Sequence, residues 1–174
     1  MAILVLSDDL TGAAGFASMV GTGIITVPFE NLPLIDIYSY KIVSVDLETR
    51  NSDNPASRIN SIIKNYRGAF ITIRIDSFLR GNIKAELKPL SGIGKILLTD
   101  TIPEFGRYTV NKKTVYKLHE INLQDIIPVN TENEIYISDS ASDCDLSKIA
   151  QICLINGYIP VDPGPLIKKY LDLI

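Results

Sequence analysis

Short apolar runs rich in β-branched residues recur along this chain, and segments whose apolar residues have helical spacing separate most of them. The first run, Ile3 to Leu6, contains no polar residue. Such runs are typical of strands that are covered on both faces in a parallel sheet. Because alternating strands and helices build βαβ units, the sequence predicts an α/β fold. We expect a doubly wound, three-layer domain with a mainly parallel sheet of about six strands, in which the first run is the central strand.

The other expected elements follow in alternation. Strands are expected at Ile24–Val27, Ile42–Val45, Ala69–Ile75, Lys95–Leu98, Ile135–Ser138 and Ile159–Val161. Capping residues and prolines predict helices at Thr11–Val20, from Asp53 or Asn54 onward, at Asn82–Leu90, from Asp143 or Asp145 onward, and at Gly164–Leu173. The stretch Pro103–Val129 interrupts the pattern. It is expected to form an excursion with a hairpin, and it is a candidate lid.

The length suits a single domain over residues 1–174, and the charge excludes two classes of partner. There are 17 Lys and Arg residues against 20 Asp and Glu residues, a net charge of −3. Proteins that neutralise nucleic-acid phosphates or anionic lipids carry an excess of Lys and Arg. We therefore expect neither nucleic acid nor a membrane surface as a partner.

The apolar stretches and the cysteines predict a cytoplasmic location. The apolar N-terminus meets Ser7 after six residues, whereas a membrane helix needs about 20. No basic segment precedes it, so we expect no signal peptide. Cys144 and Cys153 are expected to be buried, reduced thiols. Together with His119 they are too few for a structural zinc site, so no metal site is predicted.

Polar residues directly follow three of the expected strands, at the edge where open parallel sheets bind ligands. The three loops are Ser7–Gly12, Glu48–Asn51 and Asp76–Asn82. Their aspartates suit hydroxyl groups, a proton or a metal, and the planar donor groups of Arg50 and Arg80 suit a carboxylate or a phosphate. We expect the three loops to converge on one crevice that binds a small, hydroxylated organic acid.

Structural roles compete with this interpretation for several of the residues. Asp9 or Thr11 alone is also typical of a helix cap, and Asp76 and Arg80 have the spacing of a structural ion pair. The adjacent acids Asp8 and Asp9 exceed what one cap needs, which favours a functional role for the pair.

The glycines and the single histidine predict less. Gly12 is expected to allow a close approach of the backbone to a ligand or to the sheet. No G-x-G-x-x-G or P-loop pattern occurs, so the chain has no recognisable nucleotide site of its own. Gly106 and Arg107 in the excursion are candidates to close over an anion. His119 is expected to be a surface residue without a role.

Several segments resemble one known family. Asp8-Asp9-Leu10-Thr11-Gly12-Ala13 is similar to the opening motif of the four-carbon acid sugar kinases, which phosphorylate threonate, erythronate and 3-oxo-tetronate. Ile75 to Ile83 resembles the family's Asp-Ser-Thr-Leu-Arg-Gly-Asn segment. Thr49-Arg50 falls where a substrate-contacting pair is expected. Pro103 followed by Gly106 to Thr109 resembles the family's Pro…Gly-Arg-Thr-Thr segment. The resemblance covers nearly the whole chain and is to the amino-terminal, acid-sugar-binding domain.

The resemblance implies a role for each matching residue. Asp8 and Asp9 are the catalytic candidates, which would contact a substrate hydroxyl or act as a base. Arg50 would hold the carboxylate of a four-carbon sugar acid. The remaining polyol would be bound by Asp76, Ser77, Arg80, Gly81 and Asn82.

The family's ATP-binding domain follows the acid-sugar-binding domain, and the resemblance implies that it is absent from this chain. ATP and Mg²⁺ are therefore expected only with a partner domain, which a separate ATP-binding subunit would supply. A sugar-acid-binding domain without catalysis is the alternative, and the oligomeric state stays open. Three positions depart from the family pattern: Gly15 stands where an Asp is usual, Phe78 replaces a Thr, and Arg74 replaces a Lys.

A phosphoryl-receiver-like regulatory domain that binds Mg²⁺ is the alternative from another class. Its acidic pocket is loosely matched by Asp8-Asp9, Asp46, Thr72 and Lys95. The expected position of Thr72 within a strand and of Lys95 at the start of one disfavours it. A haloacid-dehalogenase-type phosphatase is disfavoured further, because its first motif separates two aspartates by one residue.

Overall fold

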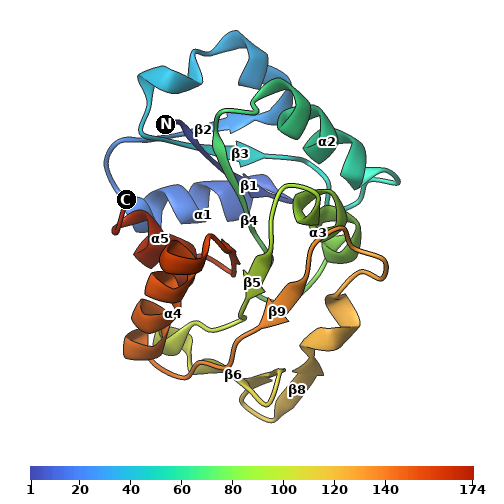
Figure 1. The fold of residues 1–174 in the computed structure, drawn as a ribbon, viewed down its shortest axis with the longest axis vertical. Helices are drawn as coiled ribbons and strands as arrows, with labels where there is room; N and C mark the ends of the chain where they lie inside the picture. Colours follow the sequence, from blue (N-terminus) through green and yellow to red (C-terminus); the bar gives the residue numbers. More distant parts are fainter.

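Strand β1 (Ile3–Ser7) is the centre of the fold in the computed structural model of this chain, which describes residues 1–174 (Figure 1). It pairs in parallel with β3 (Ile42–Asp46) and β4 (Phe70–Arg74). Strand β2 (Ile24–Pro28) adds to the outer side of β3, which gives the order β2-β3-β1-β4. All residues of β1 and β3 are buried, which explains why their apolar runs show no alternation.

A second parallel sheet continues the first. It has the order β10-β5-β9, built from β10 (Ile159–Val161), β5 (Ile96–Leu98) and β9 (Ile135–Ile137). A parallel bridge between Arg74 and Asp162 joins the ends of β4 and β10. The α/β prediction is confirmed, with the parallel strands divided between a sheet of four and a sheet of three.

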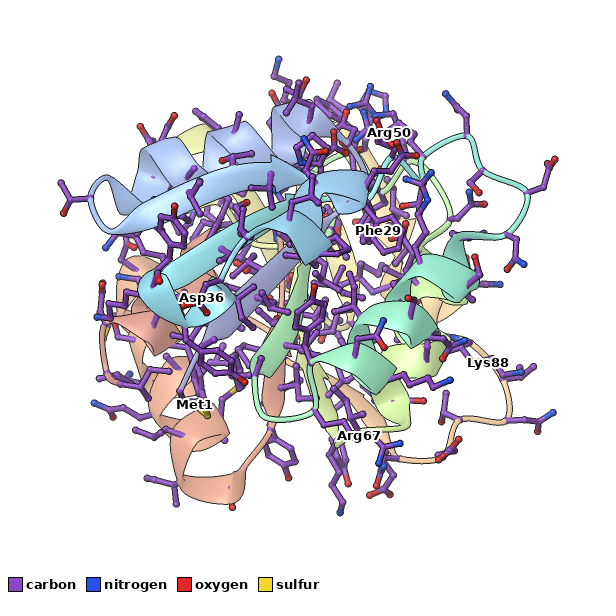
Figure 2. The ribbon with its side chains drawn as sticks, turned by 90° about the horizontal axis from the view of Figure 1, so that it is seen from above. Met1, Phe29, Asp36, Arg50, Arg67 and Lys88 are labelled. Carbon is purple, nitrogen blue, oxygen red and sulfur yellow. The ribbon has the colours of Figure 1, made fainter.

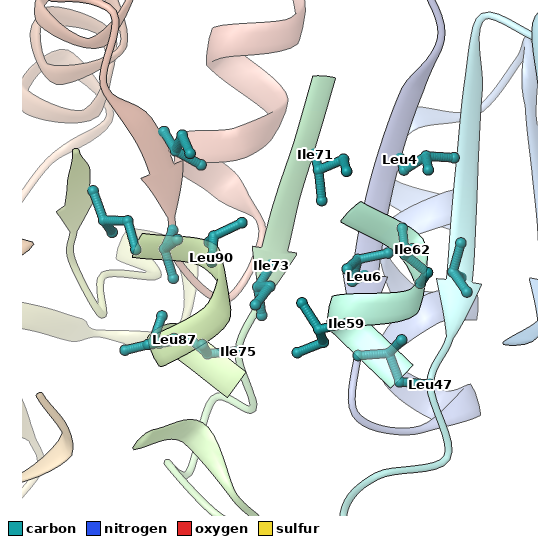
Figure 3. Packing of buried hydrophobic residues seen from close by; sticks show 14 of the residues in the cluster. Leu4, Leu6, Leu47, Ile59, Ile62, Ile71, Ile73, Ile75, Leu87 and Leu90 are labelled. Atoms are coloured by element: carbon teal, nitrogen blue, oxygen red, sulfur yellow. The ribbon is translucent and has the colours of Figure 1, made fainter. Parts of the chain in front are cut away.

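Helices α2 (Pro55–Asn65) and α3 (Ile83–Ser91) cover one face of these sheets. They do so through an apolar core of 22 buried residues. Ile59 of α2 and Leu87 of α3 pack there against strand residues such as Leu6 and Ile73 (Figure 3). Burial of this core supplies the main attachment of the two helices.

The opposite face is covered by α1 (Leu10–Val20), α4 (Asp143–Asn156) and α5 (Pro165–Leu171), through a second core of 13 buried residues. Successive strand side chains point to opposite faces. Leu4 therefore joins the first core, whereas Val5 joins the second. The expected three layers are confirmed.

The winding of the chain reverses at β1. Helix α1 leads from β1 to β2 at one edge, and α2 leads from β3 past β1 to β4. The 3-10 segments η1 (Phe29–Leu34) and η2 (Ile37–Ser39) connect β2 to β3. Because α1 and α2 lie on opposite faces, the carboxyl ends of β3, β1 and β4 border the kind of crevice where open α/β sheets bind ligands.

The predicted excursion forms a separate antiparallel sheet of β6 (Arg107–Val110), β7 (Lys113–Tyr116) and β8 (His119–Asn122). The 3-10 segments η3 (Pro103–Phe105) and η4 (Leu123–Ile126) flank it. The expected hairpin is confirmed, and a third strand is added to it. His119 is exposed, as expected.

Arg107, the first residue of β6, is buried and not at the surface of this sheet. Its Nη1 donates to Asp100 Oδ2 at 2.8 Å, and the residue is 4% exposed. The rings of Phe78 and Tyr116 lie 5.3 and 5.1 Å from its guanidinium carbon. The prediction that Gly106 and Arg107 close over an anion is therefore wrong, because the guanidinium is already enclosed.

Two further local predictions are wrong. Ser142, not Asp143 or Asp145, caps α4: its Oγ accepts the Asp145 N–H at 3.1 Å. Cys144 is exposed, whereas Cys153 is buried as expected and its burial raises the thiol pKa to about 12. None of the helices combines the length and the apolar character needed to cross a membrane.

We expect Ser142→Ala to lower the free energy of unfolding by about 1 kcal/mol, because the first turn of α4 loses its cap. Asp143→Ala is the matched control. Its exposed carboxylate pairs with Lys169 at 3.1 Å, so a loss below about 0.5 kcal/mol is expected. Urea unfolding of both variants measures the difference, and a larger loss in the control would contradict this cap.

Candidate functional site

Three loops meet at the carboxyl ends of β3, β1 and β4. Asp8 and Asp9 follow β1, Arg50 lies in the loop after β3, and Asp76 and Arg80 lie in the loop after β4. Salt bridges join residues of all three loops. The expectation that the loops converge is confirmed, and we call these five residues the Arg50 cluster.

Arg50 is the hub of the cluster. Its Nε and Nη2 donate to the two carboxylate oxygens of Asp8, at 2.8 and 3.1 Å. Its Nη1 lies 2.5 Å from Asp9 Oδ2, and its Nη2 also donates to Asp76 Oδ1 at 2.9 Å. Every nitrogen of the guanidinium therefore contacts a carboxylate of the chain itself.

Asp76 receives a second arginine. Arg80 donates from Nε and Nη2 to the two Asp76 oxygens, at 2.9 and 2.8 Å. Burial alone would raise the pKa of Asp76, but the hydrogen bonds from Arg80 and from the Phe78 N–H, with the charge of Arg50, outweigh it and lower the pKa to about 2. Asp76 is therefore a fixed negative charge. The structural ion pair predicted between Asp76 and Arg80 is present inside the cluster.

Asp9 has two roles at once. Its Oδ1 accepts the Gly12 N–H at 2.7 Å and caps α1, while its Oδ2 faces Arg50. The side chain of Asp9 is 25% exposed, against 4% for Asp8. Asp9 therefore caps α1, the structural role expected as an alternative to function, and also belongs to the cluster. It is the more accessible of the two acids.

Gly81 and Asn82 pack against the loop that contains Arg50. The Asn82 amide Nδ2 donates to the carbonyl oxygens of Thr49, Arg50 and Ser52 at 2.9, 3.3 and 3.0 Å. Gly81 has φ +85°, and a Cβ there would lie 2.9 Å from Asp8 Oδ2. Asn82 therefore holds the Arg50 loop in place, and Gly81 leaves room for the Asp8 carboxylate.

Glu86 is a site residue that the sequence reasoning missed. It is 1% exposed, and the Thr49 hydroxyl donates to its Oε1 at 2.6 Å. Burial raises the pKa of Glu86 to about 7, although the Thr49 hydrogen bond opposes this. The signal was available: Glu86 lies three residues after Ile83 and four before Leu90, on the buried face of α3.

A cavity of about 540 Å³ opens beside the cluster. We call it the Arg74 cavity, and its lining includes Gly15, Arg74, Ser77, Glu104, Phe105 and Lys168. The predicted residue Ser77 lies here and not in the cluster. A cavity of about 670 Å³, lined by Arg67 and Phe70 among others, lies at the amino ends of the strands. Figure 2 shows Arg50 and Arg67 on opposite sides of the molecule.

The arrangement does not match a phosphoryl-receiver pocket. Thr72 is buried within β4, where its hydroxyl bonds the Pro160 carbonyl. Lys95 precedes β5, at the amino edge of the sheet, and pairs with Glu134 at 3.1 Å. Neither side chain can join Asp46 at the carboxyl edge. No group of three or more His, Cys, Asp or Glu residues is arranged to hold a metal ion.

One protein family and several solved structures are similar to this chain. The family described as a sugar-binding N-terminal domain matches residues 3–126, a range that contains the whole Arg50 cluster. No curated protein matches the chain at a significant level.

The similar structures share the fold at low sequence identity. A protein from Bordetella bronchiseptica, described as a domain of unknown function (DUF1537) with bound citrate and a domain-swapped dimer, has a TM-score of 0.80 and 17% identity. The match covers 98% of this chain and 56% of that one.

Two other bacterial proteins give similar values. A Haemophilus influenzae protein of the same DUF1537 family has a TM-score of 0.74 and 14% identity, over 97% of this chain and 56% of that one. A Salmonella typhimurium LT2 protein, described provisionally as a tRNA synthase, has a TM-score of 0.75 and 14% identity, over 98% and 56%. At these identities the likeness shows the fold alone, and this chain spans little more than half the length of each.

We expect Arg50→Ala to cost about 3–5 kcal/mol of unfolding free energy at pH 7, because Asp8 stays buried without its cationic partner and Asp76 keeps only Arg80. The loss should be smaller near pH 4, where carboxylates without a cation take up protons. Urea unfolding at the two pH values measures this. Arg67→Ala, at the opposite edge, is the matched control, and a pH-independent loss in Arg50→Ala would contradict the ion-pair role.

Glu86→Gln is expected to stabilise the protein in alkaline solution. The pKa of Glu86 is raised from 4.5 to about 7, so the folded state binds this proton more tightly than the unfolded state. Wild-type stability therefore falls as the pH rises from about 4.5 to 7, by roughly 1–3 kcal/mol. Thermal unfolding between pH 5 and 8 should show the variant equal to wild type at pH 5 and more stable at pH 8. Equal stability at both ends would contradict the raised pKa.

Proposed function

Because this chain belongs to the family of sugar-binding N-terminal domains, we propose that it binds a four-carbon sugar acid such as threonate or erythronate. We propose further that it is the acceptor-binding half of an ATP-dependent acid sugar kinase. The observation that carries this proposal is the convergence of its three motif loops in the Arg50 cluster.

The charges of the cluster suit a polyol. Three carboxylates, those of Asp8, Asp9 and Asp76, face the two guanidinium groups of Arg50 and Arg80, so one net negative charge remains. Ionised carboxylates only accept hydrogen bonds, and sugar hydroxyls donate them. The bonds are charge-assisted, which makes them strong enough to orient a small ligand.

Asp9 is the group that meets the reacting hydroxyl. It is the more exposed acid of the pair, and Arg50, which is itself held by Asp8, fixes its position. In phosphoryl transfer the protein acts mainly by positioning the groups and by stabilising charge. Asp9 would accept the proton of the substrate hydroxyl as that oxygen attacks the phosphoryl donor.

The nucleotide is assigned to another polypeptide or domain. A net negative cluster repels a triphosphate, so these residues do not fit ATP. ATP and Mg²⁺ would come with a separate ATP-binding domain or subunit. The relatives' greater length leaves room for such a domain. A cytoplasmic location, where ATP is plentiful, belongs to the same proposal.

Calorimetry with threonate and erythronate tests the binding step. We expect Asp9→Asn to fold normally, since Asn also caps helices well, and to bind the acid about tenfold less tightly after losing a charge-assisted hydrogen bond. Asp125→Asn, which changes an exposed carboxylate on η4, should bind like wild type. Wild type should release no ADP from ATP unless the partner domain is added.

Three outcomes would contradict parts of the proposal. Failure of the wild type to bind either acid would remove the sugar-acid assignment. ATP turnover by this chain alone would contradict the division between two domains. Acid binding without turnover in the presence of the ATP-binding domain would favour the alternative, a sugar-acid-binding domain without catalysis.

A further inference from the structure

Arg74, at the carboxyl end of β4, stands apart from the arginines of the cluster. Four other arginines make ion pairs with carboxylates: Arg50, Arg58, Arg80 and Arg107. The Arg74 guanidinium makes one hydrogen bond, from Nε to the Pro163 carbonyl oxygen at 2.9 Å. Its two Nη groups therefore keep their donors for a ligand.

Arg74 is also the unpaired cation of its cavity. The other two cationic side chains in the lining, Lys168 and Lys169, are each held by an acid. Lys168 pairs with Asp172 at 2.7 Å, and Lys169 pairs with Asp143 at 3.1 Å. An anion that enters the cavity thus finds its strongest free donor at Arg74.

Gly12 brings Arg74 close to the acidic cluster. A Cβ on Gly12 would lie 2.6 Å from Arg74 Nη1 and 3.1 Å from Asp9 Oδ1. The guanidinium and the carboxylate therefore both lie close to one backbone position, and a larger residue would displace them. A cation and a hydroxyl acceptor stand only a few ångströms apart, a separation that a four-carbon chain can bridge.

Arg50 cannot easily take a ligand carboxylate in its place. Three carboxylates of the chain already surround its guanidinium. A fourth anion would meet their repulsion, and it would find at most one Nη1 N–H without a partner.

We propose that Arg74 binds the carboxylate of the sugar acid inside the Arg74 cavity, while the hydroxyl groups reach Asp9 across Gly12. This inference rests on the proposed function and assigns the direction in which the ligand lies. The acid end points to the cavity beside α1 and α5, and the hydroxyl end points to the Arg50 cluster.

Calorimetry with erythronate and with its neutral analogue erythritol tests the role of Arg74. Wild type should prefer erythronate. Arg74→Gln should lose about ten- to hundredfold in erythronate affinity, the value of a charge-assisted hydrogen bond, and keep its affinity for erythritol. Arg67→Gln makes the same charge change at the opposite edge and should leave both affinities unchanged. An unchanged preference for erythronate in Arg74→Gln would overturn the inference.

Citrate, used as a plain carboxylate probe, separates this inference from the proposed function. Citrate binding that depends on Arg74, without binding of erythronate or threonate, would support the carboxylate site and overturn the sugar-acid function. Erythronate binding that is equal in wild type and Arg74→Gln would overturn the inference and leave the function standing. Binding of none of these probes would overturn both.

Discussion

The ion pairs of Arg50 hold together three loops that lie far apart along the chain. Asp8 and Asp76 are almost fully buried, and buried carboxylates are tolerated only with a cation and good hydrogen bonds. Arg50 meets this need for both at once, so the loop after β3 must be fixed in place. Asn82 fixes it from one side, and the Asp8 carbonyl accepts the backbone N–H groups of Thr49 and Arg50, at 2.9 and 3.2 Å, from the other. The residues of the site therefore also fix the positions of its loops.

The buried acids of this site lower the stability of the folded state, as is common at binding sites. Glu86 is buried directly beneath the Arg50 loop, where its negative charge is disfavoured near neutral pH. The cluster holds more carboxylates than guanidinium groups. Such compromises concentrate at functional sites, because a well-packed apolar core would be at least as stable. A ligand that donates hydroxyl hydrogen bonds to the excess carboxylate would relieve part of the repulsion.

The site is polarised along its length. The Arg50 cluster is acidic, and the Arg74 cavity next to it holds an unpaired cation. The two regions meet at Gly12, where the absence of a side chain lets Arg74 Nη1 and Asp9 Oδ1 both lie close to the backbone. A ligand with hydroxyl groups at one end and a carboxylate at the other matches this polarity in one orientation only. The same fold occurs in solved structures of 14 and 17% identity, so this scaffold tolerates wide sequence variation.

The sequence by itself determined the layers, the order of most elements and the loops that form the site. These features follow from patterns between neighbours along the chain, such as the apolar run Ile3–Leu6 and the polar residues after it. It did not determine which charges are free. Only the tertiary structure decided that Arg50 is enclosed by acids, that Arg107 is buried, and that Arg74 keeps its donors. The physical reason is that pairing and burial depend on contacts between distant residues: Arg50 meets Asp8 across 42 positions and Asp76 across 26. No local pattern records such contacts.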